Sequence, residues 1–416
     1  MTANKVVISL SGGLDSTCLL LKLLSEDKEV HAYSFKYGQK HEIELTKVKK
    51  NIKFLQNKGF KVTHQIIDLT DVFSESTSSL HQGGEAIPHG DYREESMKST
   101  VVENRNVIFG SIIYGKALSW ANKTNSNVLI TLGLHAGDHC FTSDTKIITP
   151  NGYKTIKDLK QGDPIFSFNP NTLKIEVDKC IDIIEKGANN EIFNINTTTG
   201  SLKVTGEHKV YVVSYGELDR NGYSKSIEKK TAKELKVGDI LMSTNTLPGK
   251  ITAAMTKITD VSISHEEEKV YDITVEKNHN FFAGELGNIL ISNSIYPDCR
   301  PESQQAAEYL FKISNWGSEK VDYIAPFINI DKMHVLQEGV NAMKNLNFTQ
   351  EEIMEVLKNT HTCYDPDSEG RSCSKCGSCC EREESFAYVG FMDPIEYQDP
   401  EYAKKKYEEF YKKYHK

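Results

Sequence analysis

The chain of 416 residues is predicted to be an α/β protein with a doubly wound parallel sheet, interrupted by an all-β domain. The first observation is an alternation of strand and helix patterns over residues 1–139, which is typical of βαβ units. The second is a change at Cys140, after which short strand-like runs alternate with turns over 140–293. The third is the return of helical patterns, and then a cysteine cluster, over 294–416. We therefore expect three segments, in which the first and third belong to one domain.

The first segment is expected to supply the strands and helices of the parallel sheet. Short apolar, β-branched runs predict strands, and amphipathic or apolar-rich runs between them predict helices. The expected strands cover 5–10, 30–35, 61–67 and 128–132, and the expected helices cover 16–25, 45–58 and 107–121. The Ser-, Gly- and His-rich stretch 74–90 is expected to be a loop over a site.

The central segment carries an internal repeat. The run TIKDLKQGD at 155–163 recurs as TAKELKVGD at 231–239. Two related halves within one segment predict a compact β domain with pseudo-twofold symmetry. In the third segment, helices are expected over 304–313, 331–342 and 349–357, and a Tyr- and Lys-rich helix is expected at the C-terminus.

Composition places the chain among ordinary soluble proteins, with 26% charged and 38% hydrophobic residues. The net charge of −8 argues against stable nucleic-acid binding, and no apolar run is long enough to predict a membrane span. The N-terminus leads directly into a strand pattern, so we expect no signal peptide. Nine cysteines, five of them near the C-terminus, favour metal binding in a reducing cytoplasm over a disulfide scaffold.

A glycine-rich turn, SGGLDS at 11–16, lies between the first strand and its helix. Glycines allow backbone N–H groups to approach an anion, and the N-terminus of the helix adds a positive dipole end. The turn has no Gly-Lys-Ser/Thr ending, so it is no Walker A loop. The alternative is a turn without a ligand, but this sextet after a first strand favours phosphate binding.

The sextet resembles the PP-loop of the N-type ATP pyrophosphatases, which have a HUP-like fold. Three further runs narrow the resemblance to the 7-cyano-7-deazaguanine synthase (QueC) family: TVVENRN at 100–106, GLHAGDH at 133–139 and IYPDCRPE at 295–302. The C-terminal cysteines also match that family. Glu103 is a departure, because the family has proline at that position.

The resemblance implies an ATP-dependent ligase that forms carbon–nitrogen bonds. ATP would activate the carboxylate of 7-carboxy-7-deazaguanine, ammonia would replace AMP, and a second ATP would convert the amide to the nitrile. It also implies Mg²⁺ and, for the chain without its central segment, a homodimer. The residues expected to bind ATP are Ser9, Leu10, Ser11, Gly12, Gly13, Leu14, Asp15, Ser16 and Arg105. Asp138, Asp298 and Arg300 are expected to orient the substrate, although a surface loop with ion pairs would also explain them.

The cysteine cluster predicts a metal site. Cys373, Cys376 and Cys379 are separated by two residues each, and Cys363 precedes them by ten. Such spacing lets four thiolates converge on one tetrahedral ion, so structural Zn²⁺ is the leading interpretation. An iron–sulfur cluster is the nearest rival.

The borders of the central segment offer the groups that protein splicing needs. The Cys140 thiol can attack the preceding carbonyl, and Asn293 can cyclise onto its own carbonyl. Ser294 can receive the acyl group. His208, three residues after Thr205, can protonate the departing amide nitrogen.

These blocks resemble a mini-intein with the HINT fold, too short to contain a homing endonuclease. Asp272 and His279 match the family's third block, which implies that they assist transesterification and Asn cyclisation. Ser292 is a departure, because the family has His before the terminal Asn. The main alternative for the whole chain is a PP-loop tRNA-modifying ATP pyrophosphatase with a regulatory β-domain insert. A zinc-bearing nucleotide-binding module without catalysis is a third possibility.

Overall fold

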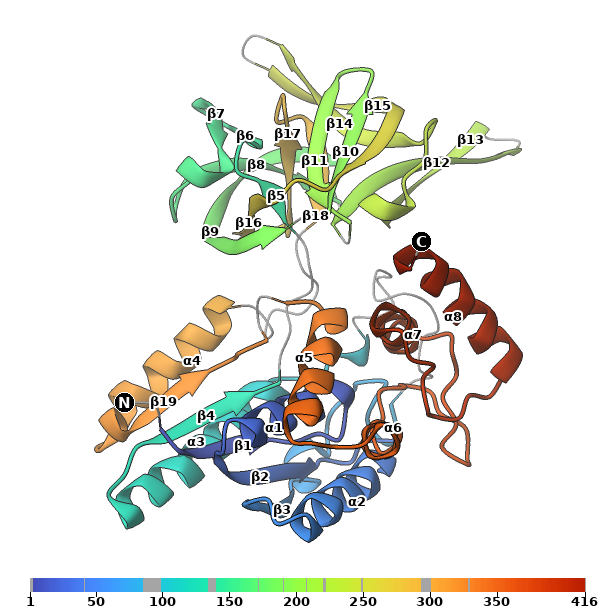
Figure 1. The fold of residues 1–416 in the computed structure, drawn as a ribbon. Helices are drawn as coiled ribbons and strands as arrows, with labels where there is room; N and C mark the ends of the chain where they lie inside the picture. The colour runs from blue at the N-terminus through green and yellow to red at the C-terminus, as the bar shows by residue number, and fades with distance from the viewer. Residues whose placement is uncertain are drawn as a thin grey trace. The chain divides into compact units, whose positions relative to one another are not determined.

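The computed structural model describes residues 3–40, 42–84, 99–133, 140–170, 172–189, 191–206, 208–219, 222–247, 250–292, 301–327 and 330–415. The chain forms two compact units (Figure 1). Met1–Ala136 and Tyr296–Lys416 together form the first, which we call the flank unit, and Gly137–Ile295 forms the second, the insert unit. The two segments on either side of the insert therefore fold together, as expected.

The flank unit contains a five-stranded parallel sheet in the order β19-β4-β1-β2-β3. Its strands are β1 (Lys5–Ser9), β2 (Glu29–Lys36), β3 (Val62–Asp68), β4 (Val128–Leu132) and β19 (Val321–Ile324). The first four match the expected strands, whereas β19 was not expected. Because β19 comes from the C-terminal flank and pairs with β4, the sheet is complete only when both flanks contribute. The strand order reverses between β1 and β4, where ligands bind in open α/β sheets.

Helices cover both faces of this sheet. Alternation along β1 decides which core each side chain joins: Val6 and Ile8 pack on one face, and Val7 packs on the other. The first core includes residues of α1 (Leu14–Ser25), α2 (Ile43–Asn57), α5 (Lys332–Asn345), α6 (Gln350–Lys358) and α7 (Gly377–Val389). The second includes α3 (Arg105–Thr124) and α4 (Pro301–Ser314), and α8 (Pro400–Tyr414) follows α7. The doubly wound architecture is confirmed.

The insert unit is all-β, as predicted. Among the described residues its strands form one antiparallel sheet that is strongly bent into a compact body (Figure 1). The strands are β5 (Phe141–Thr142), β6 (Lys146–Thr149), β7 (Gly152–Thr155), β8 (Pro164–Asn169), β9 (Lys174–Asn189), β10 (Ile192–Thr197), β11 (Gly200–Thr205), β12 (Lys209–Asp219), β13 (Gly222–Thr231), β14 (Ile240–Leu247), β15 (Lys250–Ser264), β16 (Glu268–Val275), β17 (Asn280–Gly284) and β18 (Ile289–Ser292). Their inward side chains build a core separate from that of the flank unit.

The repeated run adopts the same local structure in both copies. Each copy begins with a threonine that precedes a short 3-10 turn, Ile156–Asp158 in one and Ala232–Glu234 in the other. In the first copy the Asp163 carboxylate accepts a hydrogen bond from the Lys160 amide at 2.8 Å. In the second, Asp239 accepts the equivalent bond from Lys236 at 3.1 Å. The repeat therefore marks two structurally equivalent corners, which supports the predicted internal symmetry.

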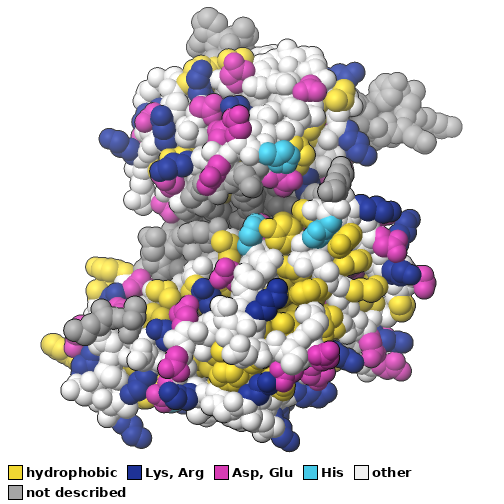
Figure 2. All heavy atoms as spheres, viewed as in Figure 1, with side chains coloured by type: hydrophobic (Ala, Val, Ile, Leu, Met, Phe, Trp, Pro, Cys, Tyr) yellow, Lys and Arg dark blue, Asp and Glu magenta, His cyan; other side chains and the backbone are white. Residues whose placement is uncertain are grey.

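The surface gives no sign of a basic face on the side shown in Figure 2, where Lys and Arg side chains are interspersed with Asp and Glu. Within the described part of the chain, a search for apolar helices of membrane-spanning length finds none.

Candidate functional sites

The glycine-rich turn lies at the carboxyl end of β1, at the point where the strand order reverses. Gly12 has a φ of +93°, and a Cβ there would stand 2.6 Å from the backbone oxygen of Glu44. Only glycine avoids both the strain and this clash. Gly13 then caps α1, so the helix begins at Leu14, two residues before the expected start. The helix N-terminus is thus directed at the turn, as anion binding requires.

Hydrogen bonds hold the hydroxyl groups of the turn together. The Oγ atoms of Ser11 and Ser16 lie 3.0 Å apart, and the Gly13 amide donates to Ser11 Oγ at 3.1 Å. The Thr17 hydroxyl donates to the Gly13 carbonyl at 2.8 Å. Two hydroxyls and the helix N-terminus therefore converge on one spot, which can accept a phosphate group.

A buried lysine lies beside this turn, and sequence reasoning missed it. Lys332 is 7% exposed, and its Nζ lies 3.7 Å from Asp15 Oδ2 and 3.0 Å from Glu381 Oε2. Burial opposes the charge, but the two carboxylates outweigh it and hold the pKa of Lys332 above its ordinary value. Lys332 is the first residue of α5, where the helix dipole disfavours a cation. A lysine in the first turn of a predicted helix is unusual, and this feature of the sequence could have drawn attention to Lys332.

The backbone of Glu44 packs against Gly12 of the nucleotide turn, and the charge of Arg105 acts on the Glu44 carboxyl group. The Arg105 guanidinium lies 5.9 Å from the centre of the Tyr37 ring, and its Nε donates to Asn106 Oδ1 at 3.3 Å. Burial raises the pKa of Glu44 to about 7, although the positive charge of Arg105 counteracts part of that rise. The Glu44 carboxyl group, with a pKa of about 7, therefore belongs to a residue that packs against the turn, and the Arg105 cation acts on it.

Glu103, the predicted departure from the family pattern, is anchored by hydroxyl groups. Its carboxylate accepts hydrogen bonds from Ser76 Oγ at 2.6 Å and from Thr77 Oγ1 at 3.1 Å. The bond from Ser76 is the main reason that the pKa of Glu103 is lowered. The substitution thus links the 74–84 loop to the start of α3. The predicted substrate residues Asp138, Asp298 and Arg300 lie outside the described residues.

The four predicted metal ligands come together. The Sγ atoms of Cys363, Cys373, Cys376 and Cys379 all lie within 4.8 Å of one another, and all four residues are buried. Zn–S bonds of about 2.3 Å in a tetrahedron require sulfur atoms about 3.8 Å apart. The observed 3.5 Å between Cys376 and Cys379, and 4.0 Å between Cys373 and Cys379, bracket that value. Zn²⁺ therefore fits this group of thiols.

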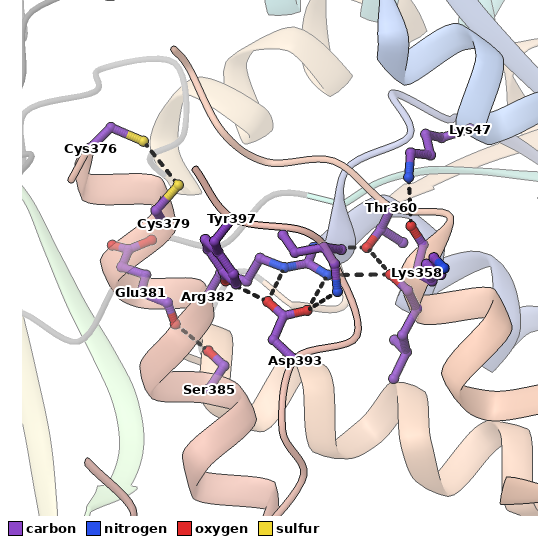
Figure 3. A network of polar contacts seen from close by, with 12 residues as sticks. Lys47, Lys358, Thr360, Cys376, Cys379, Glu381, Arg382, Ser385, Asp393 and Tyr397 are labelled. Atoms are coloured by element: carbon purple, nitrogen blue, oxygen red, sulfur yellow. Dashed lines mark hydrogen bonds and ion pairs between the residues drawn. The ribbon is translucent and has the colours of Figure 1, made fainter. Parts of the chain in front are cut away.

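Backbone amides and a buried ion pair support the cysteines. The amides of Lys375 and Cys376 donate to Cys373 Sγ at 3.4 and 3.3 Å, which favours its thiolate form. Behind the site, Arg382 is fully buried and donates to both carboxylate oxygens of Asp393 at 2.6 and 3.0 Å (Figure 3). Removal of either partner would leave a buried charge without compensation. This pair therefore fixes α7, the helix that carries Cys379.

In the insert unit, Cys140 lies between the two residues predicted to act with it. The pairing of Val204 with Phe141 places Thr205 next to Cys140 on one side. On the other side, β16 pairs with β5 in antiparallel fashion, with Tyr271 opposite Phe141. The next pair along these strands therefore places Asp272 opposite Cys140. The Cys140 amide donates to Thr205 Oγ1 at 2.9 Å, and the Thr205 amide donates to the Cys140 carbonyl at 2.9 Å. The nitrogen of the left-border peptide bond is thus held directly by Thr205.

His208 lies near Phe141 at the start of the insert and near Ser292 at the end of β18. It belongs to the turn that joins β11 to β12, it is 1% exposed, and its ring centre is 4.1 Å from that of Phe141. Val210 pairs with Ile291 in antiparallel strands. The residue that directly follows His208, Lys209, therefore lies opposite Ser292 at the end of β18. Asn293 and Ser294 lie outside the described residues. One histidine is therefore positioned near Cys140 and near the last described residue before Asn293.

His279 also lies near the right border, because the residue after it, Asn280, pairs with Ser292. Its φ of +49° is uncommon for a residue with a side chain. The preceding turn is held by Asp178, a buried residue that sequence reasoning missed. Its carboxylate accepts hydrogen bonds from the amides of Lys277 at 3.2 Å and Asn278 at 3.0 Å. No local pattern marks Asp178, since its role depends on a contact 100 residues away.

A glycine-rich anion loop at the switch point of a parallel sheet, with a four-cysteine site in the same unit, defines a PP-loop nucleotide-binding domain. The family model described as "Queuosine biosynthesis protein QueC" matches residues 5–147 and 197–390. The chain therefore belongs to the QueC family.

Two curated relatives agree with this membership. A 7-cyano-7-deazaguanine synthase of Caldicellulosiruptor saccharolyticus is 39% identical over 142 residues, which cover 34% of this chain and 59% of that protein. A 7-cyano-7-deazaguanine synthase of Pseudoalteromonas translucida is 33% identical over 184 residues, which cover 44% of this chain and 80% of that protein. The chain thus spans less than two thirds of the first relative.

Among solved structures, the DnaX mini intein from Spirulina platensis is similar to this chain with a TM-score of 0.30 and 23% identity. The match covers 37% of this chain and 100% of that structure.

Proposed function

We propose that the chain is a precursor that excises residues 140–293 and joins its two flanks. The Cys140 thiol attacks the carbonyl carbon of His139, which converts the peptide bond to a thioester. The Ser294 hydroxyl then takes the acyl group from sulfur, and Asn293 cyclises onto its own carbonyl and releases the insert. A final shift of the acyl group from oxygen to nitrogen restores a peptide bond. The observation that best supports this proposal is the position of Cys140. It lies between Thr205 and Asp272, and its amide donates a hydrogen bond to Thr205 Oγ1.

The masses of the products test this proposal. Splicing of the full chain should give a 262-residue ligated protein and a 154-residue excised insert, both identifiable by intact mass spectrometry. Cys140→Ala combined with Asn293→Ala should leave only the 416-residue chain. A wild-type chain that stays at full mass after incubation with a thiol reductant would contradict the proposal.

The ligated flanks, on this proposal, convert 7-carboxy-7-deazaguanine, ammonia and ATP to 7-cyano-7-deazaguanine. The turn at 11–16 and the N-terminus of α1 bind phosphate oxygens, and Arg105 stabilises negative charge that develops during adenylation. Ser9 and Leu10 lead into the turn, and the Ser34 hydroxyl fixes the Leu10 carbonyl at 2.5 Å. Asp138, Asp298 and Arg300 orient the substrate. Mg²⁺, held by phosphates and Asp15, would supply charge neutralisation.

Zn²⁺ in the four-cysteine site has a structural role in this proposal, and the protein acts as a cytoplasmic homodimer without stable nucleic-acid binding. The decisive assay follows nitrile formation and AMP release by the spliced protein. AMP release that depends on 7-carboxy-7-deazaguanine and ammonia supports the synthase. AMP release that depends on tRNA instead would favour the tRNA-modifying alternative.

A further inference from the structure

Two chains of contacts connect the cysteine site to the nucleotide turn, and the first runs through His361. The His361 amide donates to the carbonyl of Gly12 at 2.9 Å. Its ring Nε2 lies 3.0 Å from the carbonyl oxygen of Cys363, one of the four thiol residues. Because a carbonyl only accepts, Nε2 carries the proton in this contact. His361 is 3% exposed, so both bonds are shielded from competing water.

The second connection runs through α7 and α5. Glu381 lies two residues after Cys379 on α7 and contacts Lys332 Nζ at 3.0 Å. The same Nζ is 3.7 Å from Asp15 in the nucleotide turn. Lys332 is buried, so its position depends on both carboxylates.

Both connections start within two residues of a metal ligand and end in the turn at 11–16. Because the four Sγ atoms lie within 4.8 Å of one another, one ion can hold them together, and the positions of Cys363 and Cys379 depend on that ion. A shift of either cysteine would move His361 or Glu381, and with them Gly12 or Asp15. The turn itself has little freedom to compensate, because Gly12 packs directly against the Glu44 backbone.

We infer that His361, Glu381 and Lys332 are positioning residues through which the zinc site fixes the shape of the nucleotide turn. This inference rests on the proposed binding of ATP and zinc. On this inference the metal site helps to shape the nucleotide-binding site and does not only stabilise the fold. Zinc and nucleotide then favour each other's binding, and the coupling is reciprocal.

The test measures this coupling in both directions on the protein obtained from the full chain. A non-hydrolysable ATP analogue is titrated by calorimetry into the zinc-loaded and the chelator-stripped protein. Zinc affinity is then measured by competition with a chromogenic chelator, with and without saturating analogue. We expect each ligand to strengthen the other by the same factor, at least about fivefold. Amide hydrogen exchange of residues 11–17 should also be slower in the zinc-loaded protein.

Variants separate the connections from general stability. Glu381→Gln and His361→Phe keep the approximate size of each side chain and should reduce the coupling factor toward one while zinc still binds. Glu369→Gln is the matched control, since this glutamate of the cysteine loop is exposed and pairs with Arg371 at 3.4 Å, away from both connections. It should leave the coupling unchanged.

The outcomes are distinguishable. If analogue and zinc bind independently in the wild type, or if Glu381→Gln keeps the full coupling, the inference is wrong. If the analogue does not bind at all, the proposed ATP site is wrong, and amide exchange then decides whether zinc orders the turn. Equal exchange with and without zinc would overturn the inference in that case too.

Discussion

At the scale of single residues, the left border of the insert shows how strand pairing assembles a reactive group. Cys140 is far from Thr205 and Asp272 in sequence, but β11 and β16 flank the residue that follows it. The Cys140 amide hydrogen bond holds the nitrogen of the peptide bond that the thiol would attack in the proposed splicing reaction. Alignment of this kind lowers the barrier because the reacting atoms need no further ordering.

Thr205→Ala should slow cleavage at the left border. The substitution removes the hydroxyl that accepts from the Cys140 amide, and one such hydrogen bond contributes about 1 kcal/mol, or several-fold in rate. Gel densitometry of precursor remaining over time measures the effect. Thr205→Ser keeps the hydroxyl and serves as the control. Equal rates for the Ala variant and the wild type would show that Thr205 is only structural.

His279→Ala should impair cleavage at the right border and leave thioester formation at Cys140 intact. His279 directly precedes Asn280, which pairs with Ser292, the residue before Asn293. The expected product is chain cleaved or branched at the left border, quantified by mass spectrometry. Adding Ser292→His to this variant should restore right-border cleavage. If His279→Ala alone splices normally, His279 has no part in cyclisation.

Glu44→Gln should stabilise the flank unit at pH 8. Burial raises the Glu44 pKa from 4.5 to about 7, so the folded chain holds a proton that the unfolded chain loses. The stability of the flank unit therefore falls as pH rises from about 4.5 to about 7 and stays lower above that range. Glutamine removes this loss, so the thermal midpoint should rise at pH 8 and change little at pH 4.5.

Tryptophan fluorescence isolates this effect, because both tryptophans, Trp120 and Trp316, belong to the flank unit. Glu42→Gln is the control, since Glu42 is exposed and pairs with Lys36 at 3.0 Å. A rise at pH 8 of the same size in Glu42→Gln would assign the effect to net charge instead.

At the scale of elements, the sequence predicted those whose own residues carry the signal. The strands β1, β2, β3 and β4 and the helices around them matched, because each has an apolar pattern of sufficient length. β19 was missed since it has only four residues, and its place in the sheet comes from pairing with β4. α7 was missed because it begins inside the cysteine cluster at Gly377 and buries charged residues such as Arg382. Lys332 was missed because its two partners, Asp15 and Glu381, lie on other elements and are far away in the sequence.

Cys376→Ser should abolish tight zinc binding, whereas Cys380→Ser should retain it. Cys376 is fully buried within the group of four thiols, but Cys380 instead accepts a hydrogen bond from Lys406 Nζ at 3.0 Å. Metal content after dialysis, measured by mass spectrometry, should be about one zinc per chain in the wild type and in Cys380→Ser. Loss of zinc in Cys380→Ser would require a different ligand set. An iron–sulfur cluster would show as visible absorbance and as iron in place of zinc.

At the scale of the whole molecule, the last described residue before the insert, Gly133, lies beside the nucleotide turn. The chain leaves β4 through Gly133, where a Cβ would stand 2.9 Å from the Ser16 Cα. The insert therefore begins seven residues after Gly133, which packs against the nucleotide turn. Yet the sheet itself is complete, because β19 already pairs with β4. We therefore expect the flanks to fold before the segment that carries Asp138 and Asp298 is joined.

A splicing-blocked precursor should consequently be folded but inactive. Cys140→Ala with Asn293→Ala should bind one zinc and show the same tryptophan-detected thermal transition as the spliced protein, because the residues responsible are all in place. It should form nitrile at least about 100-fold more slowly, since the loop that carries Asp138 and Asp298 is divided and misplaced groups cost rate steeply. The spliced wild-type protein, assayed in parallel, is the reference. Full activity in the double variant would show that the divided loop is dispensable, and loss of zinc would show that the flanks fold only after they are joined.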